Sequence, residues 1–132
     1  MTQRQILVTY ALIYANGPVH LGHMLGYVQT DIWVRFQRMQ GHQCYYICGS
    51  DTHGTPIMLK AEQQGISPQD MVAKISSRQL QDFQAFGVQF DQFELTNSDH
   101  NRQYVHQIYH QLKQRGDIEQ RDVKQAYDTQ KH

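Results

Sequence analysis

The sequence has few cysteines, no long apolar run and no excess of charge of one sign. It contains two cysteines in 132 residues, Cys44 and Cys48, which excludes the disulfide framework of a small secreted domain. No apolar run approaches the roughly 18 residues of a membrane span, and the first one is too short for a secretion signal. Twelve Lys and Arg balance twelve Asp and Glu, so no whole-molecule attraction to nucleic acid or anionic membranes is expected. These absences predict a soluble, cytoplasmic chain that binds no membrane.

Short apolar segments alternate with helical patterns along the chain. Strands are expected at 6–10, 44–48 and 88–95, and the first has the composition of a strand buried on both faces of a parallel sheet. Helices are expected between them, ending at Gly41, Gly65, Gly87 and Gly116 and starting after caps such as Ser67 and Ser98 or Asn97. Residues 118–127 alternate weakly, as a hairpin arm does. The order predicts an α/β fold, the first half of a doubly wound parallel sheet.

Apolar residues recur at helical spacing in the first and third expected helices. The stripe predicted for the core on the first helix consists of Leu21, Met24, Leu25, Val28, Ile32, Phe36 and Met39. The stripe on the third consists of Met71, Val72, Ile75, Phe83 and Phe86. Cys44 and Cys48 share one face of a strand, where core packing explains them better than redox chemistry does.

The turn from the first strand into the first helix is a candidate ligand site. Ligands of open α/β sheets bind at the carboxyl ends of strands, and a helix N-terminus attracts phosphate. His20 and His23 lie three residues apart on one helix face, and Gly17 and Gly22 leave backbone open to a ligand. The alternative interpretation is that the histidines only cap the helix and the glycines only serve the turn.

A second polar loop, from 48 to 56, leaves the next strand at the same edge of the sheet. Asp51 in this loop can accept hydrogen bonds from a ligand's ammonium or ribose hydroxyl groups, or it can simply form an Asx-turn or a helix cap. His20, His23, Asp51 and His53 are an alternative metal set, although zinc-binding helices usually space histidines four apart. His100, His106 and His110 fall in the last helix, where a solvated face competes with metal binding.

Two segments of the chain, 14–24 and 49–57, resemble one enzyme family. Residues 14–24, Tyr-Ala-Asn-Gly-Pro-Val-His-Leu-Gly-His-Met, resemble the nucleotide-binding signature of class I aminoacyl-tRNA synthetases. Residues 49–57, Gly-Ser-Asp-Thr-His-Gly-Thr-Pro-Ile, are similar to the methionyl members of that class, as are residues 31–42. The resemblance extends over about 6–127. It implies an enzyme that activates methionine with ATP, releasing pyrophosphate, and then transfers the methionyl group to tRNA.

The resemblance also implies a role for individual residues. His20 and His23 would be catalytic, stabilising the ATP phosphates, and Asn16, Gly17 and Gly22 would complete the ATP site. Leu12, Tyr14 and Asp51 would bind methionine, with Asp51 holding its ammonium group. Mg²⁺ would come with the phosphates and would not be held by protein ligands, so no metal-binding residue is expected in this chain. Ile13 replaces a proline common in the family, which predicts a freer backbone before Tyr14.

Several family elements are not found in these 132 residues. They include the lysine-rich Lys-Met-Ser-Lys-Ser loop, the zinc-bearing insertion and the helical domain that reads the anticodon. We therefore expect a fragment in which residues 1–116 form the first half of the catalytic domain and residues 117–132 begin a connecting insertion. tRNA would be a partner only of the full-length enzyme. The alternatives are a small stand-alone nucleotidyltransferase of the same superfamily and a non-catalytic remnant or interaction module.

We predict that the 132-residue chain alone shows no measurable methionine-dependent ATP–pyrophosphate exchange. Losing one preorganised transition-state donor costs enzymes a factor of roughly 10²–10³, and the lysine-rich loop would supply several. The measurement is an exchange assay on a monodisperse sample, with His20→Ala as the control. Turnover that this substitution abolishes would contradict the prediction.

Overall fold

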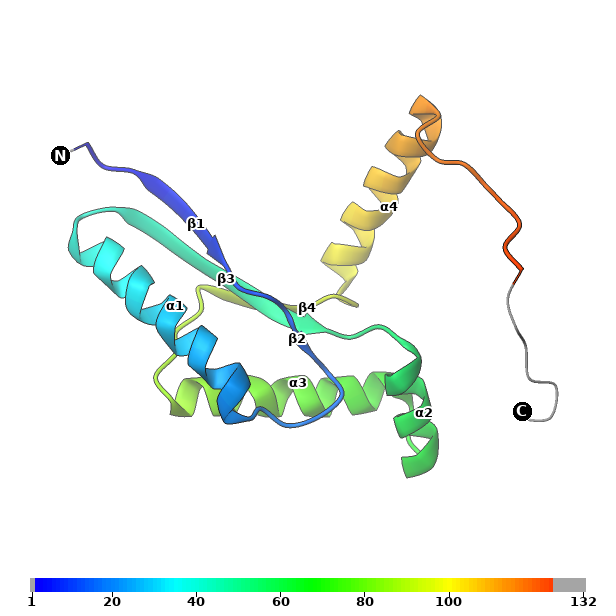
Figure 1. Cartoon of the computed structure of the whole chain (residues 1–132), viewed down its shortest axis with the longest axis horizontal. Helices are drawn as coiled ribbons and strands as arrows, with labels where there is room; N and C mark the ends of the chain where they lie inside the picture. The colour runs from blue at the N-terminus through cyan, green and yellow to red at the C-terminus, as the bar shows by residue number, and fades with distance from the viewer. Residues whose placement is uncertain (1, 125–132) are drawn as a thin grey trace.

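A computed structural model describes residues 2–124 as one parallel sheet with helices packed mainly on one side (Figure 1). The strands are β1 (Gln5–Thr9), β2 (Ile13–Tyr14), β3 (Gln43–Asp51) and β4 (Gln92–Leu95). The helices are α1 (Leu21–Met39), α2 (Thr55–Gln64), α3 (Pro68–Ala85) and α4 (Asp99–Arg115). The strand–helix alternation confirms the expected α/β class.

Strand β3 is the centre of the sheet, and all of its pairings are parallel. β1 pairs with its first half, from Gln5 opposite Gln43 to Thr9 opposite Ile47. β2 continues along the same side and pairs with the end of β3. β4 pairs with β3 on the other side, where a side chain at Gly49 would collide with the Glu94 carbonyl oxygen. The sequence pattern does not indicate β2, which has only two residues.

The core lies between one face of the sheet and helices α1 and α3. β3 contributes Tyr46 and both cysteines, which are buried and free as expected. Tyr27 of α1 packs against Phe83 of α3, with ring centroids 4.2 Å apart and ring planes inclined by 39°. The Tyr27 hydroxyl donates a 2.6 Å hydrogen bond to the Ala11 carbonyl, which ties the segment between β1 and β2 to α1.

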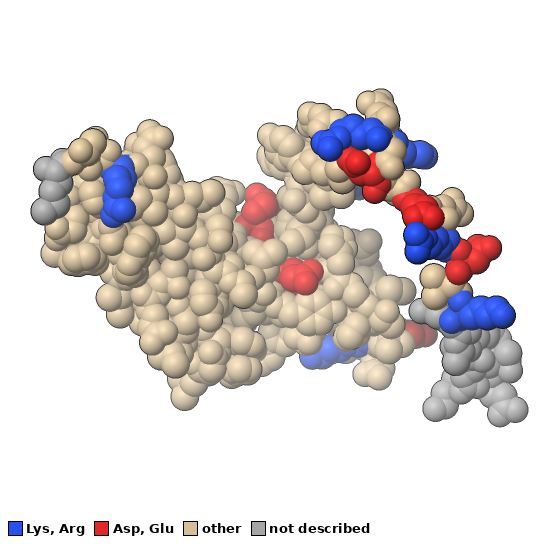
Figure 2. Space-filling model, turned by 45° about the horizontal axis from the view of Figure 1, so that its top comes forward, with Lys and Arg blue, Asp and Glu red and all other residues tan. Residues whose placement is uncertain are grey.

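The opposite face of the sheet is exposed along β1 and the first half of β3. Leu7 of β1 is 67% exposed, and Tyr45 and Ile47 of β3 are also exposed. The expectation that the first strand is buried on both faces is therefore wrong. Figure 2 shows few charged side chains over most of the visible surface and a concentration of charge near the end of α4 and beyond it. No residue of α4 is buried.

The apolar stripe predicted for α1 is also wrong. The buried residues of this helix are Met24, Tyr27, Asp31, Val34 and Gln37. Five of the seven residues of the predicted stripe are exposed instead, namely Leu21, Leu25, Ile32, Phe36 and Met39.

Polar partners explain why Asp31 and Gln37 face inward. Asp31 accepts a 2.8 Å hydrogen bond from the Gln89 amide and pairs with Arg35. Gln37 accepts a hydrogen bond from Arg4. The spacing of apolar residues alone predicts the wrong buried face for α1. The face that is buried also carries Asp31 and Gln37, which these hydrogen bonds hold inward.

The expected helix boundaries agree with the structure more closely than the strand boundaries do. Ser67 and Ser98 are N-caps, and Gly116 ends α4 in a left-handed conformation. β3 is longer than expected and includes Gly49–Asp51, whereas the strand expected at 88–95 is restricted to β4. Residues 118–124 contain no strand, and the rest of the predicted hairpin arm lies outside the described residues. The domain division at residue 116 stays a prediction.

Within residues 2–124, no helix is long and apolar enough to cross a membrane.

Phe83 is predicted to carry a large share of the stability. It has no exposed surface and contacts the rings of Tyr27, Phe90 and Phe93. Phe83→Ala should lower the free energy of unfolding by about 3–5 kcal/mol, because the lost contacts leave a cavity. Phe86→Ala is the control, with an expected change within about 0.5 kcal/mol, because Phe86 is 60% exposed. Chemical denaturation measures both, and equal losses would contradict the prediction.

Candidate functional site

The two histidines of the turn form the start of α1. His20 is the N-cap: its Nδ1 accepts a hydrogen bond from the His23 amide at 3.3 Å, and the Nδ1 of His23 accepts one from the His20 amide at 3.5 Å. Their rings stack with centroids 3.6 Å apart. The capping interpretation is therefore correct for the Nδ1 atoms, while the Nε2 atoms are left for other partners.

The N-terminus of α1 also offers main-chain donors. The amides of Leu21 and Gly22 have no hydrogen-bond acceptor within residues 2–124, and the first turn of α1 carries no acidic side chain. The positive end of the helix dipole lies at the same place. A Cβ atom on Gly22 would lie 3.2 Å from two atoms of the His20 ring, so this glycine makes room for that ring. The arrangement can bind an anion.

The second candidate loop joins the first through strand pairing. Tyr14 and Asp51 are register partners at the ends of β2 and β3, and the Ala15 amide donates a 2.8 Å hydrogen bond to the Asp51 carbonyl. The structure thus brings the two polar segments to one edge of the sheet, as the sequence predicts.

Asp51 itself is half-buried. Its Oδ1 accepts a hydrogen bond from the His53 amide at 3.4 Å, which is the Asx-turn alternative in a long, weak form. Its Oδ2 has no partner within residues 2–124, so the carboxylate retains capacity to accept a hydrogen bond from a ligand.

The other residues expected at the methionine site have different environments. Leu12 is 48% exposed just before β2. Tyr14 is half-buried, and its hydroxyl lies over Gly54, where a side chain would collide with it. Ile13 is 4% exposed in the core and pairs with Ser50. Strand pairing and burial both constrain the backbone at Ile13, and the freer backbone expected from the missing proline stays a prediction.

Two residues of this region are missed by the sequence analysis. Lys60 of α2 donates a 2.6 Å hydrogen bond from Nζ to the Asn16 carbonyl. Gln79 of α3 is completely buried and donates to the Tyr14 and Gly17 carbonyls. Lys60 has no sequence signal. Gln79 has one: it lies four residues from both Ile75 and Phe83, a polar residue at a position that faces the core.

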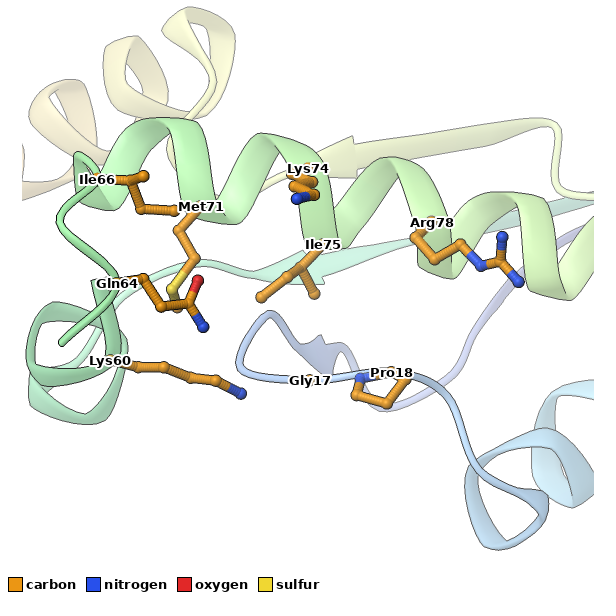
Figure 3. A pocket seen from close by; sticks show the side chains of 9 residues that line it. All are labelled: Gly17, Pro18, Lys60, Gln64, Ile66, Met71, Lys74, Ile75 and Arg78. Atoms are coloured by element: carbon orange, nitrogen blue, oxygen red, sulfur yellow. The ribbon is translucent and has the colours of Figure 1, made fainter. Parts of the chain in front are cut away.

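A pocket of about 290 Å³ lies behind the turn, between it and helices α2 and α3 (Figure 3). Gly17 and Pro18 form one wall, Lys60 reaches across from α2, and Ile75 lies on α3 opposite them. On the His20 side, a second hollow of about 310 Å³ is lined by Val19, His20, Leu21, Met24 and Phe86. Phe86 therefore faces this hollow and not the core position that the apolar stripe predicts.

No group of three or more His, Cys, Asp or Glu side chains is placed to hold a metal ion in the part of the chain that is described. His100, His106 and His110 lie on α4, away from His20 and His23 on α1.

The pKa of His23 is predicted to lie below 6.5, because burial disfavours the charged ring and the neighbouring His20 adds repulsion. The folded chain then binds this proton less readily than the unfolded chain does. The resulting stability is present above pH 6.5 and is lost as the pH falls through the lower, folded pKa. NMR titration of the His23 ring measures its pKa in the folded chain. His20→Ala should move the midpoint only part of the way back, and a wild-type midpoint at or above 6.5 would contradict the prediction.

Comparison with known proteins identifies the family. Residues 6–132 match the family described as tRNA synthetases class I (M). Over its whole length, the chain is 54% identical to the methionine–tRNA ligase of Nitrosomonas europaea, and it spans 19% of that relative's length.

Solved structures share the fold. Methionyl-tRNA synthetase of Mycobacterium tuberculosis in complex with methionyl-adenylate superposes with a TM-score of 0.81 at 23% identity, over 87% of this chain and 22% of that one. The LeuRS of Agrobacterium radiobacter K84, in a ternary complex with tRNA and LeuAMS, gives 0.80 at 19% identity, over 88% and 15%. These matches confirm the class I synthetase catalytic fold. With residues 6–132 matching the family and 54% identity along its whole length to one such enzyme, the chain belongs to the class I tRNA synthetases of the methionyl group.

Proposed function

We propose that this chain supplies the ATP-binding and methionine-binding part of a methionine–tRNA ligase. The observation that carries the proposal is the meeting of two segments at one sheet edge: the His20–His23 helix start and the end of β3 with Asp51. Family membership favours this activity over the stand-alone nucleotidyltransferase and the non-catalytic module.

In the first step, the methionine carboxylate attacks the α-phosphorus of ATP, and pyrophosphate leaves with its Mg²⁺. Negative charge shifts toward the leaving phosphates, so catalysis requires fixed donors there. Because each Nδ1 accepts a capping hydrogen bond, the proton of a neutral ring lies on Nε2. His20 and His23 would therefore donate from Nε2. This assignment requires neutral rings, and the lowered pKa of His23 favours the neutral form of that ring.

The remaining ATP contacts are assigned to main chain. The unpartnered amides of Leu21 and Gly22 would bind phosphate oxygens. Asn16 and Gly17 would contribute the turn that precedes the helix. Apart from its two chain neighbours, no atom of residues 2–124 would lie within 4 Å of a Cβ atom at Gly17, so the backbone there is open to a ligand.

Methionine is assigned to the end of the β2–β3 pair. Asp51 Oδ2 would accept a hydrogen bond from the ammonium group, and the carboxylate of methionine would then face the nucleotide. Leu12 and Tyr14 would contact the methionine side chain. Gly54 has no side chain and so leaves space for the Tyr14 hydroxyl. In the second step, a terminal ribose hydroxyl of tRNA would take the methionyl group from the adenylate.

Asp51→Asn tests the methionine assignment. The amide keeps the size of the side chain but loses the charge that pairs with ammonium, a loss of about 1.5–3 kcal/mol, or roughly 10- to 150-fold in methionine affinity. ATP affinity should change by less than about threefold. NMR titration of the chain with each ligand at millimolar concentration measures both affinities.

The matched control is Asp122→Asn, which removes an exposed carboxylate after α4 and should change neither affinity. A defect in ATP binding alone would overturn the role of Asp51. A wild-type chain that binds neither ligand would overturn the proposed function.

A further inference from the structure

The side-chain amide of Gln79 links three segments of the candidate site. Its Nε2 donates to the carbonyl oxygens of Tyr14 at 3.1 Å and Gly17 at 2.9 Å. Its Oε1 accepts a hydrogen bond from the Ser50 hydroxyl at 3.0 Å. Gln79 and Ser50 have no exposed surface. Both amide hydrogens and one oxygen lone pair are therefore used, all inside the protein.

The three partners belong to the two halves of the proposed site. Tyr14 ends β2, and Gly17 lies in the turn before the histidines, so the two donated bonds hold both ends of the 14–17 turn. Ser50 immediately precedes Asp51 on β3. One planar group on α3 thus joins the nucleotide half to the amino-acid half, beside the main-chain bond from Ala15 to Asp51.

A primary amide suits this position because it combines two donors with an acceptor in one plane. A carboxylate has the same shape but no donor, and it would face two carbonyl oxygens. A methionine side chain has a similar length and leaves those carbonyls unpaired. Lys60 also holds the turn, through Asn16, but it is only half-buried and exchanges its bond with water more easily.

We propose that Gln79 is a positioning residue that fixes the distance between the phosphate-binding turn and Asp51. The proposal rests on the proposed function, because it assigns those two segments to one reaction. Its consequence is selective: a ligand that spans both halves depends on their separation, whereas a ligand that occupies one half does not. Displacements of about 1 Å can cost a reaction about 10²-fold when two groups must be aligned.

The test compares Gln79→Met and Gln79→Glu with two controls in the full chain. Ser76→Ala changes a buried polar residue on the same helix whose hydroxyl has no hydrogen-bond partner among the described residues. Gln81→Met makes the same substitution at an exposed glutamine two residues away.

The first readout needs no ligand. In Gln79→Met and Gln79→Glu, the Ala15 amide should exchange its hydrogen at least about tenfold faster, while amides of the β1–β3 ladder change by less than about threefold, because only the turn is released. The controls should change neither set. Uniform acceleration along the chain would mean a general loss of stability and would overturn the proposal, as would unchanged Ala15 exchange.

The second readout is binding of a non-hydrolysable sulfamoyl analogue of methionyl-adenylate, methionine alone and ATP alone, measured by NMR titration. Gln79→Met should weaken the analogue by at least about tenfold and each single ligand by less than about threefold. Equal weakening of all three, or of none, would overturn the proposal while leaving the proposed function intact. If the wild-type chain binds none of the three, the proposed function fails, and the role assigned to Gln79 fails with it.

Discussion

The candidate site depends on two residues of parallel strand pairing. Ile13 and Tyr14 of β2 lie opposite Ser50 and Asp51 of β3, and without this pairing the two polar segments would leave the sheet separately. Two ladder residues are a weak attachment by themselves. The structure reinforces them from the core with Ile13, from α3 with Gln79 and from the main chain through Ala15 and Asp51.

The same pairing explains how β1 and β2 share one side of β3. Pairing between β1 and β3 ends at Thr9. The Tyr27 hydroxyl then donates a hydrogen bond to the Ala11 carbonyl, in the segment between β1 and β2. Tyr10 packs edge-on against Tyr27 in the same place, over Gly26, where any side chain would collide with the Tyr10 ring. Two contacts with Tyr27, one at the Ala11 carbonyl and one at the Tyr10 ring, therefore hold this exposed segment against α1. After this segment the chain pairs with β3 again, where Tyr14 lies opposite Asp51.

Much of the fold follows from local signals, and the failures have identifiable causes. Caps and glycine stops place the helices because they depend on a few neighbouring residues, as at Ser67 and Gly116. β2 is too short to have a periodicity. The double burial expected of β1 rests on composition, which does not reveal whether anything packs on the second face of the strand. Among the described residues Leu7 is left 67% exposed there. Motif residues point to the histidine turn and to Asp51, whereas Lys60 acts only through a contact distant in sequence.

Polar residues at core-facing positions are the most informative departures from the apolar pattern. Asp31 on α1 accepts a hydrogen bond from the Gln89 amide and thereby holds the connection from α3 to β4. Gln79 on α3 fixes the connection from β2 to α1. In each case a buried side chain from a helix satisfies main-chain groups of a connection between two elements, or of the strand end beside it, which offsets the cost of burying the side chain. Ser76 occupies an equivalent position and has no hydrogen-bond partner among the described residues, so burial of a polar group does not by itself indicate such a link. What distinguishes the linking residues is that their partners are main-chain groups of another segment.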